Sequence, residues 1–227
     1  ALLPNVLYNE ACALSLYGQT DRALASLAAA FDAGFDHVEM LDNDDDLNPL
    51  RKLAEFATLQ QRVERRHVEA RLDRSKSGEF PFSFRLADAQ AKKVALDDFK
   101  GKVTVVHLWG TWCVPARKEL PHLADLYRRY RDKGLAVVGV SEEPREAGEA
   151  RKALAEFVKK NEVPYPCVVG DEATRKQIPE FAGYPTTLVL DRAGRVRLRA
   201  DGYQPLGALE AMVATMLDEG RQPPAAK

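Results

Sequence analysis

The sequence predicts an α/β domain with a mixed central sheet, preceded by an all-helical segment. Near-continuous apolar runs such as "VTVVHLW" and "LAVVGV" alternate with amphipathic helix patterns, as expected of strands that are buried on both faces. Residues 4 to about 72 carry helix signals only. We therefore expect a helical segment at 1–72, a polar linker at 73–79, the α/β domain at 80–219 and a tail at 220–227.

Composition excludes several classes of protein. The 227 residues are 45% hydrophobic and 30% charged, which is ordinary for a soluble globular chain. The formal net charge of -1 argues against a nucleic-acid or anionic-membrane surface, and no apolar run reaches the roughly 20 residues that span a bilayer. Cys12, Cys113 and Cys167 are too few and too scattered for a disulfide framework or a metal site, and no cofactor is expected. The chain begins at Ala1 without a visible signal peptide, so we expect a processed or trimmed form.

Three helices are expected in the first segment. The run "PNVLYNEACALSLYG" leads to Gly18, which is typical of a helix end, and Thr20 or Asp21 is expected to cap a second helix. A third helix is expected to begin with Pro49 at its first position. The residues expected on inward helix faces are Ala11, Ser15, Ala23, Leu27, Ala30, Phe31, Gly34, Leu53, Phe56, Val63 and Ala70.

Strands and helices alternate in the second segment. Amphipathic helices are expected around residues 120–130, 150–158 and 206–216, and "DRAGR" is typical of a hairpin turn. The expected strands are Phe82–Leu86, Val103–Leu108, Leu135–Val140, Cys167–Val169, Thr187–Leu190 and Val196–Arg199.

The stretch "VVHLWGTWCVPARKELPHL" places Cys113 where an apolar strand runs into a helix. A thiolate at a helix start meets unpaired backbone N–H groups and the positive end of the helix dipole, which makes it a nucleophile near neutral pH. Trp109 and Trp112 flank the cysteine, and Pro115 costs no hydrogen bond in the first turn. A buried, inert cysteine is the alternative, but the strand–helix junction favours an exposed, reactive thiol.

These residues also resemble a known family. "GKVTVVHLWGTWCVPARKELPHL" together with "GYPTTLVLDRAGRV" resembles the thioredoxin fold, in the TlpA/ResA-like branch of extracytoplasmic thiol-disulfide oxidoreductases, over residues 78 to 219. The resemblance implies that Cys113 is the attacking cysteine of a W-C-x-x-C motif, preceded by Trp112. It implies that Pro185 is a cis-proline opposite the cysteine, and that the backbone of Tyr184 faces an extended substrate.

Two further positions carry expectations from this resemblance. Glu119 matches a glutamate that lies near the dithiol and helps to move protons, although a favourable interaction with the helix dipole is the simpler explanation. His107 occupies a strand position where thioredoxins have a buried Asp. A histidine in an apolar strand is usually a satisfied core residue, so we leave it out of the catalytic set.

Ala116 departs from the family pattern. That position holds the resolving cysteine, which attacks the mixed disulfide and releases the substrate. Three explanations stay open: an engineered alanine that traps the adduct, a natural protein in which Cys113 works as a monothiol, or resolution by another thiol. Cys167 lies in the same domain but is expected to be a packed strand residue, and Cys12 is expected to be structural.

The stretch "LYNEACALSLYGQTDRALASLAAAFDAGF" resembles one tetratricopeptide repeat. Stacked repeats normally need about three units to share a core. Either further repeats precede this segment, which we favour, or its helices dock on the second domain. The resemblance also implies a protein partner at the helical segment.

The expected function is thiol–disulfide exchange through Cys113 and Glu119, with a protein or small-thiol disulfide as substrate and a redox donor protein as partner. Two alternatives are a non-catalytic thioredoxin-fold module that binds peptides or partners, favoured by Ala116, and a peroxiredoxin-type peroxide reductase. The resemblance implies an extracytoplasmic (periplasmic or secreted) location. The net charge and the lack of a long apolar run predict no bound nucleic acid and no membrane insertion of this chain.

Overall fold

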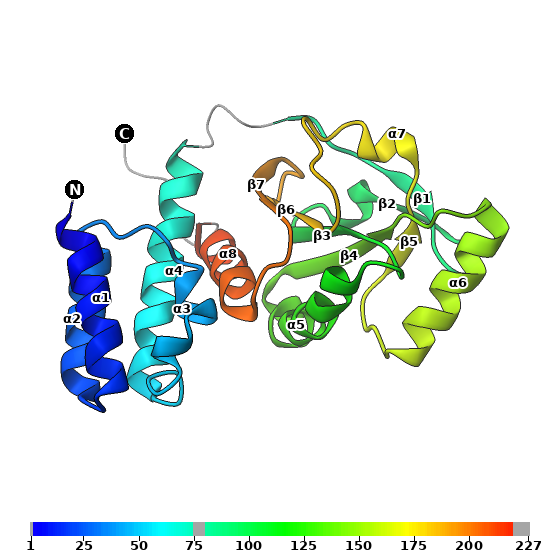
Figure 1. The fold of residues 1–227 in the computed structure, drawn as a ribbon. Helices are drawn as coiled ribbons and strands as arrows, with labels where there is room; N and C mark the ends of the chain where they lie inside the picture. The colour runs from blue at the N-terminus through cyan, green and yellow to red at the C-terminus, as the bar shows by residue number, and fades with distance from the viewer. Residues whose placement is uncertain (1, 75–79, 220–227) are drawn as a thin grey trace, which may run out of the picture. The chain divides into compact units, whose positions relative to one another are not determined.

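The computed structural model describes residues 2–74 and 80–219 and divides into two compact units, Ala1–Ala70 and Arg71–Lys227 (Figure 1). The predicted tail and most of the predicted linker lie outside the described residues. The first two residues of that linker belong to a helix, because α4 (Ala54–Arg74) runs through positions 73 and 74. No helix in the described ranges combines the length and apolar character that crossing a membrane requires.

Unit 1 is helical. It contains α1 (Leu3–Leu16), α2 (Thr20–Asp32), the short α3 (Met40–Asn43), the 3-10 helix η1 (Asp45–Leu47) and α4 as far as Ala70. The predicted stop at Gly18 is confirmed: its φ of 73° is left-handed, and the amides of Gly18 and Gln19 donate to the carbonyls of Ser15 and Leu14. This paired arrangement satisfies carbonyls that the end of α1 leaves open.

Two predicted helix starts in unit 1 are wrong. The N-cap of α2 is Gln19, so Thr20 is already helical and neither it nor Asp21 caps the helix. The third helix begins at Ala54 instead of Pro49, because the segment between them is held in turns. Arg51 donates from this segment to the carbonyls of Leu41 and Asp44 at 2.9 and 2.7 Å.

The core of unit 1 joins α1 and α2 to the segment that follows them. Tyr8 stacks on Phe35 with ring centroids 4.2 Å apart, and its hydroxyl donates to Asp44 Oδ2 at 2.7 Å. Ser15 Oγ donates to the carbonyl of Asp46 at 2.6 Å. Predicted inward positions that are buried are Ala11, Ser15, Ala23, Leu27, Ala30, Phe31, Phe56 and Val63. Gly34 lies beyond α2 and is exposed, because the chain turns there with a φ of 100°.

Unit 2 is built on a five-stranded mixed sheet with the strand order β5-β4-β3-β6-β7. The strands β3, β4 and β5 are parallel, whereas β6 and β7 run antiparallel to their neighbours. Every residue of β3 and β4 is buried, as the continuous apolar runs predict. The bounds are β3 (Val103–Trp109), β4 (Leu135–Ser141), β5 (Cys167–Val169), β6 (Thr186–Leu190) and β7 (Val196–Asp201).

The first predicted strand is shorter than expected and belongs to a separate hairpin. β1 (Arg85–Ala87) pairs antiparallel with β2 (Lys93–Ala95), which the sequence analysis missed. Phe82 and Phe84 precede β1 in irregular chain but are buried all the same. They pack in one cluster with the side chains of one sheet face, including Val106 on β3.

Helices cover the opposite face of the sheet (Figure 1). His107 and Trp109 of β3 point to this face, because His107 contacts Glu119 and Trp109 packs on Phe157 with ring centroids 5.2 Å apart. The contacting side chains come from α5 (Val114–Tyr130) and α6 (Ala147–Lys160), and α8 (Leu206–Glu219) packs beside α5. The remaining short helices are η3 (Leu96–Phe99), η4 (Arg131–Lys133) and α7 (Glu172–Arg175). Because β3 ends at Trp109 and α5 begins at Val114, Cys113 lies at the end of the short connection between them, directly before α5.

Candidate active site

Cys113 is the N-cap residue of α5, at the strand–helix junction that the sequence predicts. Its amide donates to the carbonyl of Gly110 at 2.9 Å, and its carbonyl accepts from the amide of Arg117 at 3.1 Å. The expectation of an exposed thiol is wrong: Cys113 is only 5% exposed, because Sγ lies 3.6 Å from the carbonyl oxygen of Tyr184. The preceding residue, Trp112, is 51% exposed.

The loop before β6 faces the cysteine. The Tyr184–Pro185 peptide bond in this loop is cis. The carbonyl of Pro185 accepts from the amide of Gly202 at 2.8 Å, and the carbonyl of Gly183 accepts from Thr186 Oγ1 at 2.7 Å. These bonds hold the backbone of Tyr184 beside the sulfur of Cys113. Trp112, Tyr184, Pro185 and Cys113 are thus brought together, as expected.

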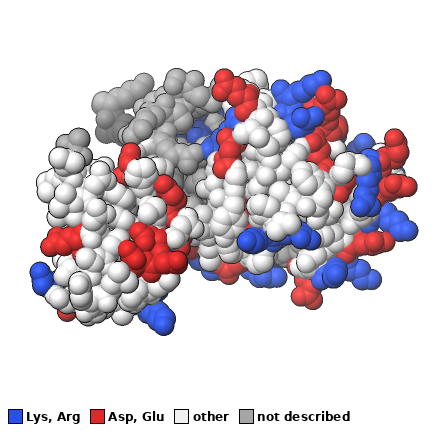
Figure 2. All heavy atoms as spheres, viewed as in Figure 1, with Lys and Arg blue, Asp and Glu red and all other residues white. Residues whose placement is uncertain are grey.

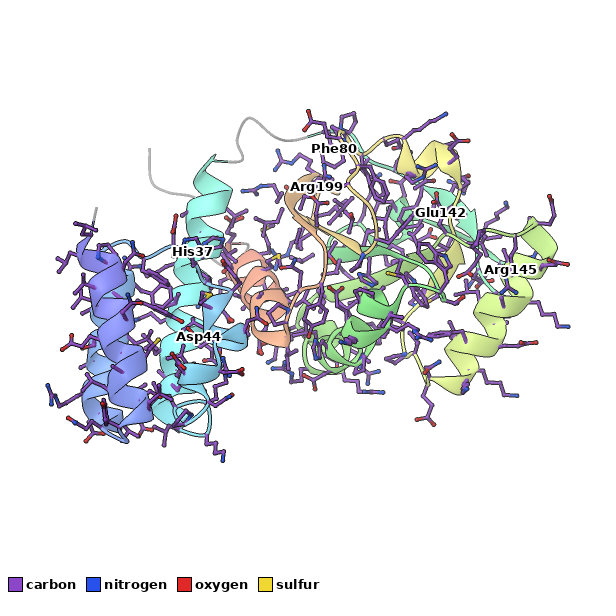
Figure 3. All side chains as sticks on the ribbon, in the orientation of Figure 1. His37, Asp44, Phe80, Glu142, Arg145 and Arg199 are labelled. Carbon is purple, nitrogen blue, oxygen red and sulfur yellow. The ribbon has the colours of Figure 1, made fainter. Side chains whose placement is uncertain are left out.

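Two adjacent glutamates that follow β4, Glu142 and Glu143, contact the loop before Cys113 and the loop before β6. The sequence did not predict these contacts. Glu142, labelled in Figure 3, accepts from the hydroxyl of Tyr184 and from Arg175 Nε at 3.2 Å. Its carbonyl also accepts from Trp112 Nε1 at 2.9 Å, and the rings of Trp112 and Tyr184 meet edge to face at 5.5 Å. One residue therefore links both side chains that flank the thiol.

Glu143 fixes the turn that carries the cysteine. Its carboxylate accepts from the amide and the hydroxyl of Thr111 at 2.8 and 2.7 Å, and from Ser141 Oγ at 2.6 Å. The only sequence signal for this role is the position of two acidic residues directly after a buried strand that neighbours β3. Such a position places them at the same sheet edge as the cysteine.

Ala116 and Glu119 are both fully buried on the inner side of α5. Glu119 accepts from the amide of Gln204, and its Oε2 lies 3.3 Å from His107 Nδ1. His107 is also fully buried, and its Nδ1 lies 3.2 Å from Thr187 Oγ1. Ala116 therefore lies in the first turn of α5, one turn before Glu119, and Glu119 contacts the buried His107.

Burial keeps both members of this contact uncharged at neutral pH. Burial raises the pKa of Glu119 from its usual 4.5 to about 8, although the hydrogen bond from Gln204 works in the opposite direction. Burial lowers the pKa of His107 from 6.5 to about 3. At pH 7 the site thus contains a protonated carboxyl group that contacts a neutral imidazole.

The other two cysteines are far less suited to attack. Cys167 is as little exposed as Cys113, but it lies within a strand instead of at a helix start, and burial raises the pKa of its thiol to about 12. It lies level with His107, two strands away, because Gly139 pairs with both residues. Burial and the carboxylate of Asp44 raise the pKa of Cys12, in unit 1, to about 11.

Among the described residues, one cluster has ligand atoms close enough for a metal ion: Cys12, Asp44 and Asp46. The Asp44 carboxylate already accepts from Tyr8 on one oxygen and from the amide of Asp46 on the other. The raised pKa of Cys12 keeps its thiol protonated. These contacts favour a hydrogen-bonded structural cluster over a metal centre.

A mixed sheet with a cysteine at the strand–helix junction, facing an X-Pro loop, defines a thioredoxin-like fold. The chain belongs to the AhpC/TSA family, whose model matches residues 78–199. The thiol-disulfide oxidoreductase ResA of Bacillus thuringiensis subsp. konkukian (strain 97-27) is 31% identical over 128 residues, covering 56% of this chain and 71% of ResA. ResA of Bacillus subtilis (strain 168) is 32% identical over 114 residues, covering 50% and 61%.

Solved structures agree with this assignment. A DsbF homologue from Corynebacterium diphtheriae is 26% identical with a TM-score of 0.53, and the match covers 60% of this chain and 87% of that one. A thiol:disulfide interchange protein from Chlorobium tepidum TLS, at 21% identity and a TM-score of 0.54, shows the fold alone over 61% and 95% of the two chains. The chain is thus a homologue of thiol-disulfide oxidoreductases, and the match lies in unit 2.

Proposed function

We propose that this protein performs thiol–disulfide exchange through Cys113. The observation that carries the proposal is the position of Sγ, at the start of α5 and 3.6 Å from the carbonyl of Tyr184. The thiolate of Cys113 attacks one sulfur of a substrate disulfide, the substrate S–S bond breaks, and the second sulfur leaves as a thiolate. The product is a mixed disulfide between Cys113 and the substrate. Backbone N–H groups at the start of α5 stabilise the attacking thiolate.

Substrate binding is assigned to Trp112, Tyr184 and Pro185. The half-exposed indole of Trp112 offers an apolar surface beside the thiol. The backbone of Tyr184 and Pro185 runs opposite Cys113, where an extended polypeptide substrate lies across the sulfur. Protein disulfides, small-thiol disulfides and a redox donor protein are the partners that this chemistry requires.

Glu119 is assigned the role of a catalytic proton donor. With a pKa of about 8 it holds a proton at pH 7, and burial keeps that proton from water. A protonated carboxyl group supplies the proton that a leaving thiolate needs. The hydrogen bond from Gln204 fixes the orientation of the carboxyl group.

Release of the mixed disulfide at Cys113 is left to an external thiol and is slower than release by an intramolecular resolving thiol. Ala116 offers no sulfur at the position of the resolving cysteine, and Cys167 and Cys12 remain protonated and buried. A natural monothiol protein and an adduct-trapping variant share this behaviour. The same feature supports a second function, a thioredoxin-fold module that binds extended polypeptides without turnover.

Unit 1 is proposed to be a tetratricopeptide-type segment that binds a protein partner. The pattern of buried small residues on α1 and α2, with Ala11, Ala23 and Ala30 fully buried, supports this proposal. Exposed apolar side chains on or next to α1, including Val6, Leu16 and Tyr17, provide the contact surface. We assign the protein to an extracytoplasmic compartment, because disulfide exchange on structural disulfides belongs to oxidising environments.

Intact mass spectrometry after reaction with 5,5'-dithiobis(2-nitrobenzoate) tests the proposal. The folded chain should gain one thionitrobenzoate group, located at Cys113 by peptide mapping. Cys113→Ser should gain none, and the matched control Cys167→Ser should react at the parent rate. Primary labelling at Cys167 or Cys12, or no labelling of the folded chain, would overturn the assignment of Cys113.

A further inference from the structure

A groove of about 730 Å³ lies between α5 and α6 on unit 2. Thr111 lines the groove, two residues before Cys113 in the loop that carries the thiol. Apolar side chains contribute to its lining, among them Leu120, Phe157 and Val163. The groove is distinct from the contact between Cys113 and Tyr184, and the proposed exchange chemistry does not use it.

Basic side chains line the same groove. Arg117 and Arg128 come from α5, Arg145 precedes α6 and is labelled in Figure 3, and Lys160 ends α6. All four residues are exposed. Two carboxylates, Glu156 and Glu162, also line the groove, so cations exceed anions by two.

The four cations of the groove have no side-chain partner within the described part of the chain, since none of them makes a side-chain ion pair or hydrogen bond there. Some other cations of unit 2 are paired, as Arg129 is with Glu210 at 2.5 Å and Arg175 with Glu142 at 3.2 Å. Others, such as the exposed Lys118 and Lys152, are as unpaired among the described residues as those of the groove, so the groove differs in gathering four such cations around one hollow. In Figure 2 blue and red side chains alternate over much of unit 2, which is the usual arrangement on a soluble surface. The groove is therefore a place where positive charge is left without an internal partner.

We propose that this groove binds an acidic segment of the polypeptide with which Cys113 reacts. Carboxylates of the segment meet the four cations, and its apolar side chains contact Leu120 and Phe157. The proposal rests on the proposed function, because a cysteine next to the bound acidic segment has to reach Cys113, two residues beyond Thr111 at the edge of the groove. Exposed charges of this kind contribute more to partner choice and to the association rate than to affinity.

A fluorescein-labelled peptide that contains alternating Glu and Leu and no cysteine tests the groove without testing the chemistry. Fluorescence anisotropy should show binding to the full chain. Binding should weaken when NaCl rises from 0.1 to 1 M, since the screening length falls from about 10 to about 3 Å. A peptide with Lys in place of every Glu should not bind.

A pair of matched variants localises the binding. Arg128→Gln/Lys160→Gln removes two cations of the groove and should weaken peptide binding about five- to tenfold. Lys118→Gln/Lys152→Gln removes two exposed cations from the same two helices outside the groove, and should bind like the parent chain. Equal losses in both variants, no binding of the acidic peptide, or equal binding of the Lys peptide would overturn the proposal. Binding to phosphatidylglycerol vesicles instead of the peptide would also overturn it.

A second probe separates failure of the groove from failure of the exchange chemistry. The same peptide carries a terminal cysteine as its mixed disulfide with thionitrobenzoate. Attack by Cys113 joins the peptide to the protein and releases yellow thionitrobenzoate, so the rate follows directly from absorbance. Peptide binding without release would retain the groove and reject the exchange chemistry. Equally fast release from the Glu and Lys peptides would retain Cys113 as the nucleophile and reject the groove.

Discussion

Replacing Glu119 by Gln should change how the stability of the protein depends on pH. Gln has nearly the same shape, can accept the hydrogen bond from the amide of Gln204, and cannot ionise. The parent carboxyl group has a pKa of about 8 when folded and 4.5 when exposed. Because the folded pKa is raised, its stabilising contribution is full below pH 4.5 and is lost as pH rises towards 8 and beyond.

The size of the effect follows from these values. Each pKa unit corresponds to about 1.4 kcal/mol, so between pH 5 and pH 8 Glu119 costs the parent chain roughly 3–4 kcal/mol of unfolding free energy. His107 works in the opposite direction. Its folded pKa of about 3 lies below 6.5, so its contribution is full above pH 6.5 and is lost as pH falls towards 3. Over the same interval it adds about 2 kcal/mol to both proteins.

Urea denaturation at pH 5 and pH 8 measures the difference. The two groups together should make the parent chain less stable at pH 8 by roughly 1–2 kcal/mol, while Glu119→Gln should become more stable by about 2 kcal/mol. Titrating groups that do not contact Glu119 affect both proteins alike, so the double difference of roughly 3–4 kcal/mol reports Glu119 together with its contact with His107. Parallel pH profiles for the two proteins would refute a neutral, buried Glu119.

Two other substitutions probe the frame of the site. Gly139→Ala should destabilise the protein by about 1–3 kcal/mol in urea denaturation, because the added Cβ would lie 2.9 Å from both Cys167 Sγ and Trp109 Nε1; a change below about 0.5 kcal/mol would contradict that close approach. Glu143→Ala leaves three hydrogen-bond donors without their acceptor, so it should lower the free energy of unfolding by about 2–4 kcal/mol and slow labelling of the Cys113 thiol. The control Glu146→Ala removes an exposed carboxylate that makes no capping hydrogen bond, and it should have neither effect. Equal effects of the two substitutions would show that Glu143 does not hold the turn.

The parts of the fold that the sequence predicts best are those in which the hydrophobic pattern is continuous. β3 and β4 are buried along their whole length, so their apolar runs determine their positions almost to the residue. β2 has only three residues, and burial of Val94 within "KVA" gives no alternation long enough to recognise. The start of α4 was missed because tertiary hydrogen bonds from Arg51, and not the local preference of Pro49, decide where that helix begins.

The candidate site also has a part that local sequence predicts and a part that depends on residues far apart in the chain. The junction that carries Cys113 is local in sequence, so the strand–helix pattern predicts it directly. Burial of the thiol depends on Tyr184, 71 residues away, and local sequence carries no signal for it. The same holds for Glu142, whose link to Tyr184 forms only when the ends of two strands meet. The pKa of Glu119 likewise depends on how tightly the tertiary structure closes around it.

The reduction of insulin by dithiothreitol, compared between the parent chain and Ala116→Cys, tests the central claim most directly. Position 116 lies in the first turn of α5, on its buried side, so a thiol placed there lies within one turn of Cys113. The parent chain should remain near the uncatalysed rate and accumulate mixed disulfides at Cys113, and Ala116→Cys should turn over, because an intramolecular thiol releases the adduct faster than an external one. Equal, substantial activity in both proteins would contradict the role assigned to position 116. Inactivity of both, without adducts at Cys113, would contradict the exchange chemistry itself.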